Sequence, residues 1–362
     1  MLALEWADLV ALRTELDAAF ATTPDIDSFC SSPAWVFAAH AALMPPRELY
    51  ARRSEHGWAI LARSRHGVGE HAWASLESLE ATWCLASPFA HRAEDADALA
   101  IDLARDWQSC VPRDILFLSG LAVGSPLFLG LVRALTPRYG LTTDAVPVTR
   151  RFRASLRDGE AGFLSRRSPS LRHRLRQSEK KALRAGVTFA PLAATTARDA
   201  HALLERLIAL ESRSWKGLAG DGLLLPSLQA FYREMLPALA EAHTLRVQVG
   251  TKDGVDVALI VGAVTRTPSG PTYRGLQFSF DNAYRSLSLG NLAQLVQVRA
   301  LIDEGVTLYD LGSDVDYKRR WGEDAFDTVT LVAVPLALRI RLPDVSMAGV
   351  SVPGLSMTDA NS

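Results

Sequence analysis

Cysteine is scarce in this chain of 362 residues, and the three cysteines that occur are widely separated: Cys30, Cys84 and Cys110. Their spacing fits neither a disulfide framework nor a metal site, so we expect free thiols in a reducing compartment. The eight histidines also lack a metal-ligand spacing, and no metal is predicted. Gly-Lys-Ser/Thr phosphate loops, Gly-x-Ser-x-Gly nucleophile elbows and dinucleotide fingerprints are missing as well.

Long apolar runs are also absent, since no segment reaches about 18 uninterrupted apolar residues. The first residues, MLALEWADLVALRTEL, carry acids where a secretory signal would carry basic residues. We therefore expect a cytoplasmic protein with no membrane span.

Lysine is rare, with five residues against 34 arginines, and the net charge of −1 argues against a DNA-binding protein. The charge is uneven along the chain. Residues 1–150 hold 12 Arg, no Lys and 18 acidic residues, a net charge of −6. Residues 163–186 hold eight basic residues and one acid, a net charge of +7.

The length exceeds what one hydrophobic core usually supports, so two domains are expected. Helix and strand signals alternate through residues 1–157, and a basic helix within 158–186 is expected to bridge the two halves. Ser168 and Pro169 predict its start and Gly186 its end. Its predicted apolar stripe consists of Leu171, Leu175 and Leu183. A second domain follows over 187–343, and the Ser- and Gly-containing tail, 344–362, is expected to be disordered.

The second half has the clearest pattern, beginning with a strand and two helices that extend to about residue 242. A three-strand meander comes next, and its first turn is predicted at Lys252-Asp253-Gly254. The middle strand is apolar on both faces and should be central. A helix from Gly290 to Glu304 and strands at Val306–Leu311 and Thr328–Val334 are expected to close this domain.

The turn between the third meander strand and the helix near Gly290 is the most informative feature. A strand that leads into a helix through small residues leaves unpaired N–H groups at the helix start. With the helix dipole, these groups form an anion site. The sequence therefore predicts an enzyme that holds a phosphorylated donor.

Several motifs in this order resemble the GNAT (N-acetyltransferase-type) acyltransferases: Leu210-Glu211-Ser212-Arg213-Ser214-Trp215-Lys216-Gly217, Phe280-Asp281-x-x-Tyr284-Arg285, Gly290, Tyr309-Asp310-Leu311-Gly312 and Tyr317-Lys318-x-x-Trp321. The set is similar to the CelD/BcsL-like branch, which is related to the Fem-type peptidyltransferases. The resemblance covers about residues 160–335 well and the first half more loosely. It implies an α/β protein of two tandem GNAT-like domains, each a mixed sheet flanked by helices, with the C-terminal domain catalytic.

The resemblance also implies a site that moves an acyl group from acyl-CoA to an amine of a sugar, amino acid or small metabolite. The expected donor-binding residues are Arg285, Ser286, Ser288, Leu289, Gly290 and Asn291. The expected catalytic residues are Lys318 for the oxyanion, Asp310 as base or acceptor anchor, and Tyr317 as proton donor to the leaving thiolate. The expected acceptor-binding residues are Trp215, Lys216, Asp281 and Trp321. Structural alternatives stay open: capping for the serines and aspartates, and packing for Tyr317 and Trp321. Arg285 could instead cap a loop at the surface, and Lys318 could be a solvated turn lysine. Trp215 and Lys216 could simply end a helix, with the lysine at the negative end of its dipole.

One departure keeps other functions open. The usual GNAT donor loop reads Arg/Gln-x-x-Gly-x-Gly/Ala, whereas Ser288 stands at the first glycine position here. Fem-type relatives take the acyl group from aminoacyl-tRNA, and the basic helix at 166–184 would suit tRNA as a partner. A non-catalytic GNAT-fold binding or assembly module is the other alternative. For transfer from acyl-CoA we expect direct attack by the amine, since no Cys or Ser has an evident base partner.

Overall fold

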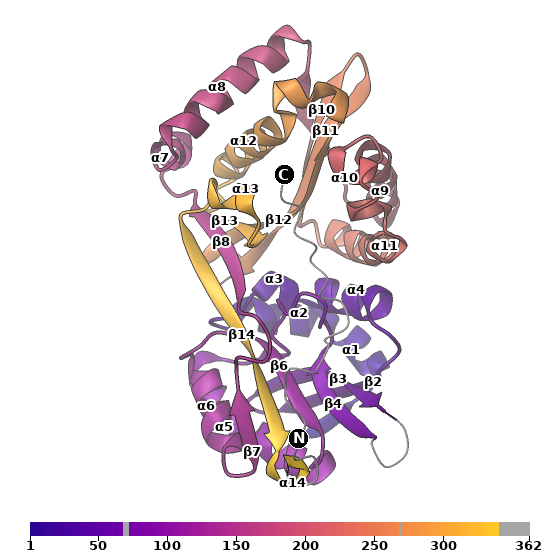
Figure 1. Ribbon diagram of the computed structural model, residues 1–362, viewed down its shortest axis with the longest axis vertical. Coiled ribbons are helices and arrows are strands. Elements are labelled where there is room, and N and C mark those ends of the chain that lie inside the picture. The colour runs from indigo at the N-terminus through magenta and orange to yellow at the C-terminus, as the bar shows by residue number, and fades with distance from the viewer. Residues whose placement is uncertain (68–71, 268, 340–362) are drawn as a thin grey trace. The chain divides into compact units, whose positions relative to one another are not determined.

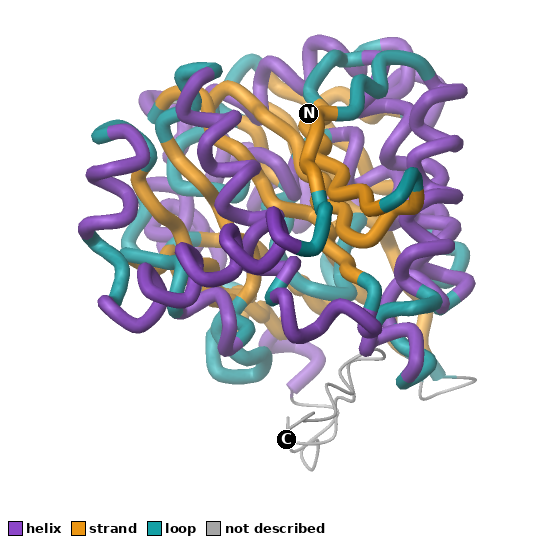
Figure 2. The backbone as a smooth tube through the Cα atoms, turned by 90° about the horizontal axis from the view of Figure 1, so that it is seen from above, coloured by secondary structure: helices purple, strands orange, loops and turns teal. Residues whose placement is uncertain are grey.

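The computed structural model describes residues 1–67, 72–267 and 269–339, which form two compact units (Figure 1). Unit 1 comprises Met1–Thr149 and the segment from Asp327 onward, and unit 2 comprises Arg150–Phe326. Helices flank the strands (Figure 2), which confirms the predicted α/β class. The predicted disordered tail, 344–362, lies outside the described residues.

Unit 1 is built on a mixed sheet in the order β1-β2-β3-β4-β6-β14, in which β5 pairs with β3 and β7 with β14. Among the described residues of unit 1, β4 and β6 pair in parallel, and the other neighbouring strands in this order pair antiparallel. Its elements are β1 (Leu2–Leu4), α1 (Trp6–Ala11), α2 (Arg13–Thr22), α3 (Ser28–Ser31), α4 (Pro33–Leu43), β2 (Glu48–Ser54), β3 (Gly57–His66), β4 (Trp73–Ser78), β5 (Phe89–Ala90), η2 (Ala93–Asp95), α5 (Ala96–Cys110), β6 (Ile115–Leu121), α6 (Pro126–Leu135), β7 (Tyr139–Thr142), β14 (Asp324–Pro335) and α14 (Leu336–Arg339).

Unit 2 contains a sheet in the order β8-β13-β12-β11-β10-β9. Within this order only β12 and β13 are parallel neighbours. Its elements are β8 (Thr149–Ser155), α7 (Gly159–Ser165), α8 (Pro169–Arg184), β9 (Thr188–Pro191), α9 (Ala197–Glu211), α10 (Trp215–Leu218), η3 (Gly222–Leu224), α11 (Pro226–Glu241), β10 (Leu245–Lys252), β11 (Val255–Thr267), β12 (Gly270–Phe280), η4 (Asn282–Leu287), α12 (Leu289–Asp303), β13 (Leu308–Ser313) and α13 (Asp316–Arg319).

The predicted meander is confirmed as β10, β11 and β12. Lys252 pairs with Val255, so Asp253 and Gly254 form a two-residue turn, and both have positive φ (50° and 78°). That conformation matches the twist of the flanking strands. The central strand β11 is buried from Val257 to Ala263, as its apolar pattern predicted.

The basic helix α8 begins at Pro169 as predicted, and the Ser168 hydroxyl accepts a hydrogen bond from the Leu171 N–H at 3.2 Å. It packs against α12 inside unit 2, whereas the sequence suggested a bridge between the two halves. Its buried stripe is Leu171, Leu175, Ser178 and Ala182, while Leu183 is 77% exposed. The sequence assigned Leu183 to that stripe, but twelve residues after Leu171 the helix has turned roughly a third of a circle away.

The last strand also differs from its predicted place. The sequence placed Thr328–Val334 at the close of the second domain. In the structure β14 pairs with β6 and β7 of unit 1, so the chain returns to the unit in which it began. Strand signals identify such an element but cannot specify its partner, because pairing between distant segments depends on the whole fold.

The core of unit 2 surrounds α12, which contributes apolar residues on two sides. Leu295, Val298 and Leu301 join one cluster, and Leu289 and Leu292 join another that includes Ala182 of α8. Trp321 lies in the first cluster and is 1% exposed, with its ring 6.2 Å from that of Phe163. Its burial favours a packing role over the predicted contact with substrate.

Replacing Trp321 with alanine should lower the free energy of unfolding by about 3–5 kcal/mol, because it empties a fully buried aromatic site. Trp215→Ala is the matched control, since Trp215 is 53% exposed, and it should cost less than about 1 kcal/mol. Urea unfolding followed by circular dichroism measures both. An equal decrease in the free energy of unfolding in the two variants would contradict the burial of Trp321.

Candidate active site

Strands β12 and β13 pair only briefly and then part. Their parallel register runs from Thr272 opposite Leu308 to Arg274 opposite Asp310, although β12 continues to Phe280. Residues 272–274 are buried, whereas residues 275–278 beyond the last pair are only half-buried. This segment of β12, residues 275–280, has no pairing with β13 and is called the unpaired edge below.

The unpaired edge leads through η4 into α12. Ser288, between the two helices, adopts the left-handed conformation (φ 54°, ψ 43°) that glycine adopts without strain. The backbone therefore takes a glycine-type turn at the position where the GNAT loop usually has glycine. The N–H groups of Leu289 and Gly290 make no hydrogen bond among the described residues. They are unpaired amides of the kind expected at this helix start, and their binding of an anion stays a prediction.

Gly290 is required by close packing at this turn. A β-carbon there would lie 2.9 Å from Phe278 Cε2 and 3.2 Å from Phe280 Cδ1 and Cε1. The first turn of α12 is thereby pressed against two aromatic residues of the unpaired edge. Of the other predicted donor residues, Leu289 is fully buried in the core beside Leu292, so it can offer only its backbone N–H.

Two cationic side chains accompany this helix start. Arg285 of η4 is exposed, and its guanidinium makes no hydrogen bond among the described residues. Lys181 of α8 is also exposed, and its Nζ lies 3.5 Å from the carbonyl oxygen of Ser286. The basic helix therefore places at least one of its charges beside the predicted phosphate site, which the sequence did not indicate.

The carboxyl end of β13 carries a buried ion-pair cluster around Asp310. Its Oδ2 accepts hydrogen bonds from Arg151 Nη1 at 2.7 Å and Arg274 Nη1 at 2.8 Å, and its Oδ1 accepts from the Gly312 N–H at 2.8 Å. Both carboxylate oxygens are thus engaged. This geometry favours a role in fixing the two arginines over the predicted role of a base.

Tyr317 and Lys318 follow on the short helix α13. The Tyr317 ring lies 5.3 Å from the Phe278 ring, edge to face, and burial raises the pKa of its phenol, which weakens it as a proton donor. A β-carbon at Gly312 would lie 3.4 Å from both Lys318 Nζ and Arg274 Nε. The Lys318 ammonium therefore lies at the end of β13, beside the Asp310 cluster.

A second buried carboxylate, Glu211, lies at the end of α9 and is 0% exposed. Its partners are five hydrogen-bond donors from the following loop and from β12: Ser214 Oγ (3.3 Å), Lys216 Nζ (2.9 Å), the Leu223 N–H (3.4 Å), Gln277 Nε2 (2.9 Å) and Ser279 Oγ. Burial lowers the pKa of the Lys216 ammonium, and the Glu211 carboxylate opposes that shift. Glu211 thus ties residues 214–224, called the acceptor loop below, to the unpaired edge.

Lys216 also reaches the unpaired edge directly. Its Nζ donates a hydrogen bond to the Phe278 carbonyl oxygen at 3.2 Å. The Tyr232 hydroxyl donates in the same way to the Leu276 carbonyl oxygen at 3.4 Å. Phe278 therefore contacts Lys216 through its backbone, and Gly290 and Tyr317 through its ring.

The remaining predicted site residues cap a helix or lie partly or fully exposed at the surface. Asp281 Oδ2 pairs with Arg213 Nε at 2.9 Å, and its Oδ1 accepts from the Ala283 N–H, so it caps η4. Trp215 is exposed at the start of the acceptor loop. Ser286 is exposed and Asn291 is half-buried at the donor turn.

Sequence reasoning missed Glu211, Phe278 and Lys181 as members of this region. Glu211 stands in a quoted motif, but an acidic residue at a helix end normally faces solvent. A signal was available, since Gly217 and Gly222 follow closely. A β-carbon at Gly217 would lie 2.0 Å from the Glu211 backbone oxygen, and one at Gly222 2.4 Å from Glu211 Oε1.

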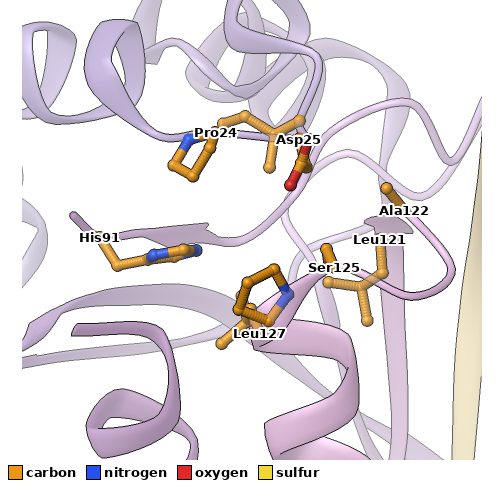
Figure 3. A pocket seen from close by; sticks show the side chains of 9 residues that line it. Pro24, Asp25, His91, Leu121, Ala122, Ser125 and Leu127 are labelled. Carbon is orange, nitrogen blue, oxygen red and sulfur yellow. The ribbon is translucent and has the colours of Figure 1, made fainter. Parts of the chain in front are cut away.

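Unit 1 contains two hollows of its own. His91 and Asp25 point into a cavity of about 10 Å³, which Ser125 and Leu127 also line (Figure 3). That space suits a single water molecule. A second hollow, of about 440 Å³, is more open. Its lining residues are Gln108, Pro112, Arg113, Pro137, Arg138, Tyr139, Pro335, Leu336 and Ala337. Neither contains any residue predicted to carry chemistry.

Part of this chain matches a family of known proteins. Residues 169–319 match the family described as the Acetyltransferase (GNAT) domain. The crystal structure of FemX superposes with a TM-score of 0.63 and 12% identity, covering 95% of this chain and 100% of that one. A conserved protein of unknown function from Bacteroides thetaiotaomicron superposes with a TM-score of 0.58 and 11% identity, covering 90% and 97%. At these identities the two structures show a shared fold alone. No curated protein sequence matches the chain.

Among the described residues, no helix combines the length and the apolar character that crossing a membrane requires.

Replacing Gly222 with alanine should destabilise the acceptor loop through the clash with Glu211. Gly220→Ala is a matched control, since Gly220 also has positive φ (74° against 67°) but open space around its α-carbon. Backbone strain should cost each variant about 1–2 kcal/mol. The clash should cost Gly222→Ala about 1–3 kcal/mol more.

Urea unfolding of the two glycine variants measures this difference. Identical free energies of unfolding would show that the loop does not press on Glu211.

Proposed function

We propose that this protein is a GNAT-type N-acyltransferase that moves an acyl group from acyl-CoA to an amine. One observation carries the proposal. The strands β12 and β13 separate after Arg274 and Asp310, and β12 then leads through η4 to the start of α12. Two N–H groups there make no hydrogen bond among the described residues. The match of residues 169–319 to the GNAT domain supports the same reaction class. The CelD/BcsL type remains our proposal for the branch, and the cytoplasm our expectation for the compartment.

The donor would bind with its phosphates at the start of α12. The amides of Leu289 and Gly290 would donate to phosphate oxygens, and the helix dipole would favour their charge. Arg285 could contact them bidentately and Lys181 as a point charge. Ser286, Ser288 and Asn291 would complete the polar surface of this turn. The acyl arm would then lie along the unpaired edge.

The acceptor would approach from the side of the acceptor loop, where Trp215 is exposed. A neutral amine would attack the thioester carbonyl directly, and placing it beside the donor supplies much of the rate. Lys318 would stabilise the oxyanion, and Tyr317 would lie close to the leaving sulfur. Asp310 would act through Arg151 and Arg274, which it holds in place, and Asp281 would keep the donor turn folded.

An aminoacyl-tRNA-dependent, Fem-like transferase is the second candidate, and the surface of α8 favours it. His173, Arg174, Arg176, Lys180, Lys181 and Arg184 are exposed on this helix. Such a surface would give strongly salt-dependent binding to a nucleic acid. The third candidate is a non-catalytic module. It is less favoured because Ser288 adopts the left-handed conformation of the usual glycine. A chain that had lost its donor site would have no need of this strained turn.

Isothermal titration of the purified protein with acetyl-CoA tests the proposal. Arg285→Glu and Lys181→Glu should each raise the dissociation constant at least about tenfold, since a charge-assisted hydrogen bond contributes about 1.5–3 kcal/mol. Arg174→Glu makes the same charge change on α8, about two turns before Lys181. It should change the affinity less than about twofold at fixed salt concentration.

The controls separate the candidates. Absence of binding to acetyl-CoA and to longer acyl-CoAs would overturn the acyl-CoA proposal. Loss of aminoacyl-tRNA binding in Arg174→Glu, with no binding of any acyl-CoA, would establish the Fem-like alternative instead.

A further inference from the structure

The Lys216 amine lies on the unpaired edge and is largely shielded from water, unlike the lysines of α8 and of the β10–β11 hairpin. The chain has five lysines: Lys180, Lys181, Lys216, Lys252 and Lys318. Lys180 and Lys181 are exposed on α8, and Lys252 pairs with Asp253 at the tip of a hairpin. Only 19% of the Lys216 side chain is exposed, although it lies on a surface loop. Its amine is held on the unpaired edge by the Phe278 carbonyl and by Glu211.

We propose that Lys216 is a self-acylation site, at which the bound acyl-CoA transfers its acyl group to Nζ of the enzyme's own lysine. This inference rests on the proposed function, because it requires a bound thioester. It adds a modification site and an internal substrate to the acceptor side of the site.

The proposal follows from where the amine lies. Phe278 joins the two halves of the site, because its ring packs on Gly290 at the donor turn and its carbonyl accepts from Lys216 Nζ. A donor with its phosphates at residues 285–290 and its arm along the unpaired edge would bring its thioester past this carbonyl. Lys216 therefore offers a primary amine at that edge.

Glu211 supplies the base that such a step needs. Its Oε1 lies 2.9 Å from Lys216 Nζ, which is hydrogen-bond distance for proton transfer. Because both groups are shielded from water, passing one proton from the ammonium to the carboxylate would convert a buried ion pair into a neutral pair. The lowered pKa of Lys216 acts in the same direction, since it raises the fraction of free amine.

The step balances as an ordinary acyl transfer. Glu211 takes one proton from the ammonium, and the freed lone pair attacks the thioester carbonyl carbon. The new C–N bond forms as the C–S bond breaks, and the electron pair leaves with sulfur. The second amine proton goes to the coenzyme A thiolate, and Glu211 later returns its proton to solvent.

The product would be a stable amide, so it is a modification rather than an intermediate. Acylation removes the positive charge beside Glu211 and leaves its carboxylate with the four neutral donors of the cluster. The acceptor loop would lose its ion pair with Glu211 at the end of α9. Exposure to the acyl donor would therefore change the acceptor side of the enzyme.

Mass spectrometry of the purified full-length chain incubated with acetyl-CoA tests this. Intact mass should rise by about 42 Da, the mass of one acetyl group. Peptide mapping should place that group on Lys216 at a rate at least tenfold above that of Lys252, the internal control for non-enzymatic acetylation. Unfolding the protein in urea before adding acetyl-CoA should abolish the preference.

Two variants sharpen the result. Lys216→Arg keeps the charge and should eliminate the single acetylation, and Glu211→Gln should slow it at least tenfold while Lys252 keeps its rate. Equal labelling of Lys216 and Lys252 in a protein that binds coenzyme A would overturn the inference and leave the proposed function standing. Failure to bind coenzyme A at all would instead overturn the proposed function.

Discussion

A single parallel strand pair, β12 and β13, determines where α12 begins in unit 2. Parallel neighbours cannot be joined by a hairpin, so the chain must cross over between β12 and β13, and α12 forms that crossover. The crossover helix then begins at the carboxyl end of β12, where ligands of α/β folds usually bind. The amides of Leu289 and Gly290 and the end of β13 therefore share one edge of the sheet because of the topology.

Two buried carboxylates near this edge of the sheet, Asp310 and Glu211, both have cationic partners. Asp310 accepts from Arg151 and Arg274, and Glu211 accepts from Lys216. Desolvation offsets much of the attraction within such pairs, so they add little net stability, but losing one partner costs about 3–5 kcal/mol. We infer that these pairs hold the backbone near the parting strands in a fixed geometry.

The sequence was informative where turn and capping residues determine local structure, as at the Lys252–Gly254 turn and the Ser168 cap. Periodicity and turn residues also predicted the β12–α12–β13 order that creates the site. Contacts between distant segments were not predictable in the same way. The motif that contains Glu211 does not indicate that its side chain is buried, and the pairing of β14 with unit 1 depends on the assembled fold. The predicted base, Asp310, illustrates the same limit, since its two arginine partners lie 36 and 159 residues away.

A crystal structure of the protein with coenzyme A tests the proposed donor site most directly. We expect diphosphate density within hydrogen-bond distance of the Leu289 and Gly290 amides. We also expect the pantetheine arm between β12 and β13, beside Phe278. Coenzyme A bound elsewhere, with the start of α12 covered by protein side chains, would contradict the proposed donor site.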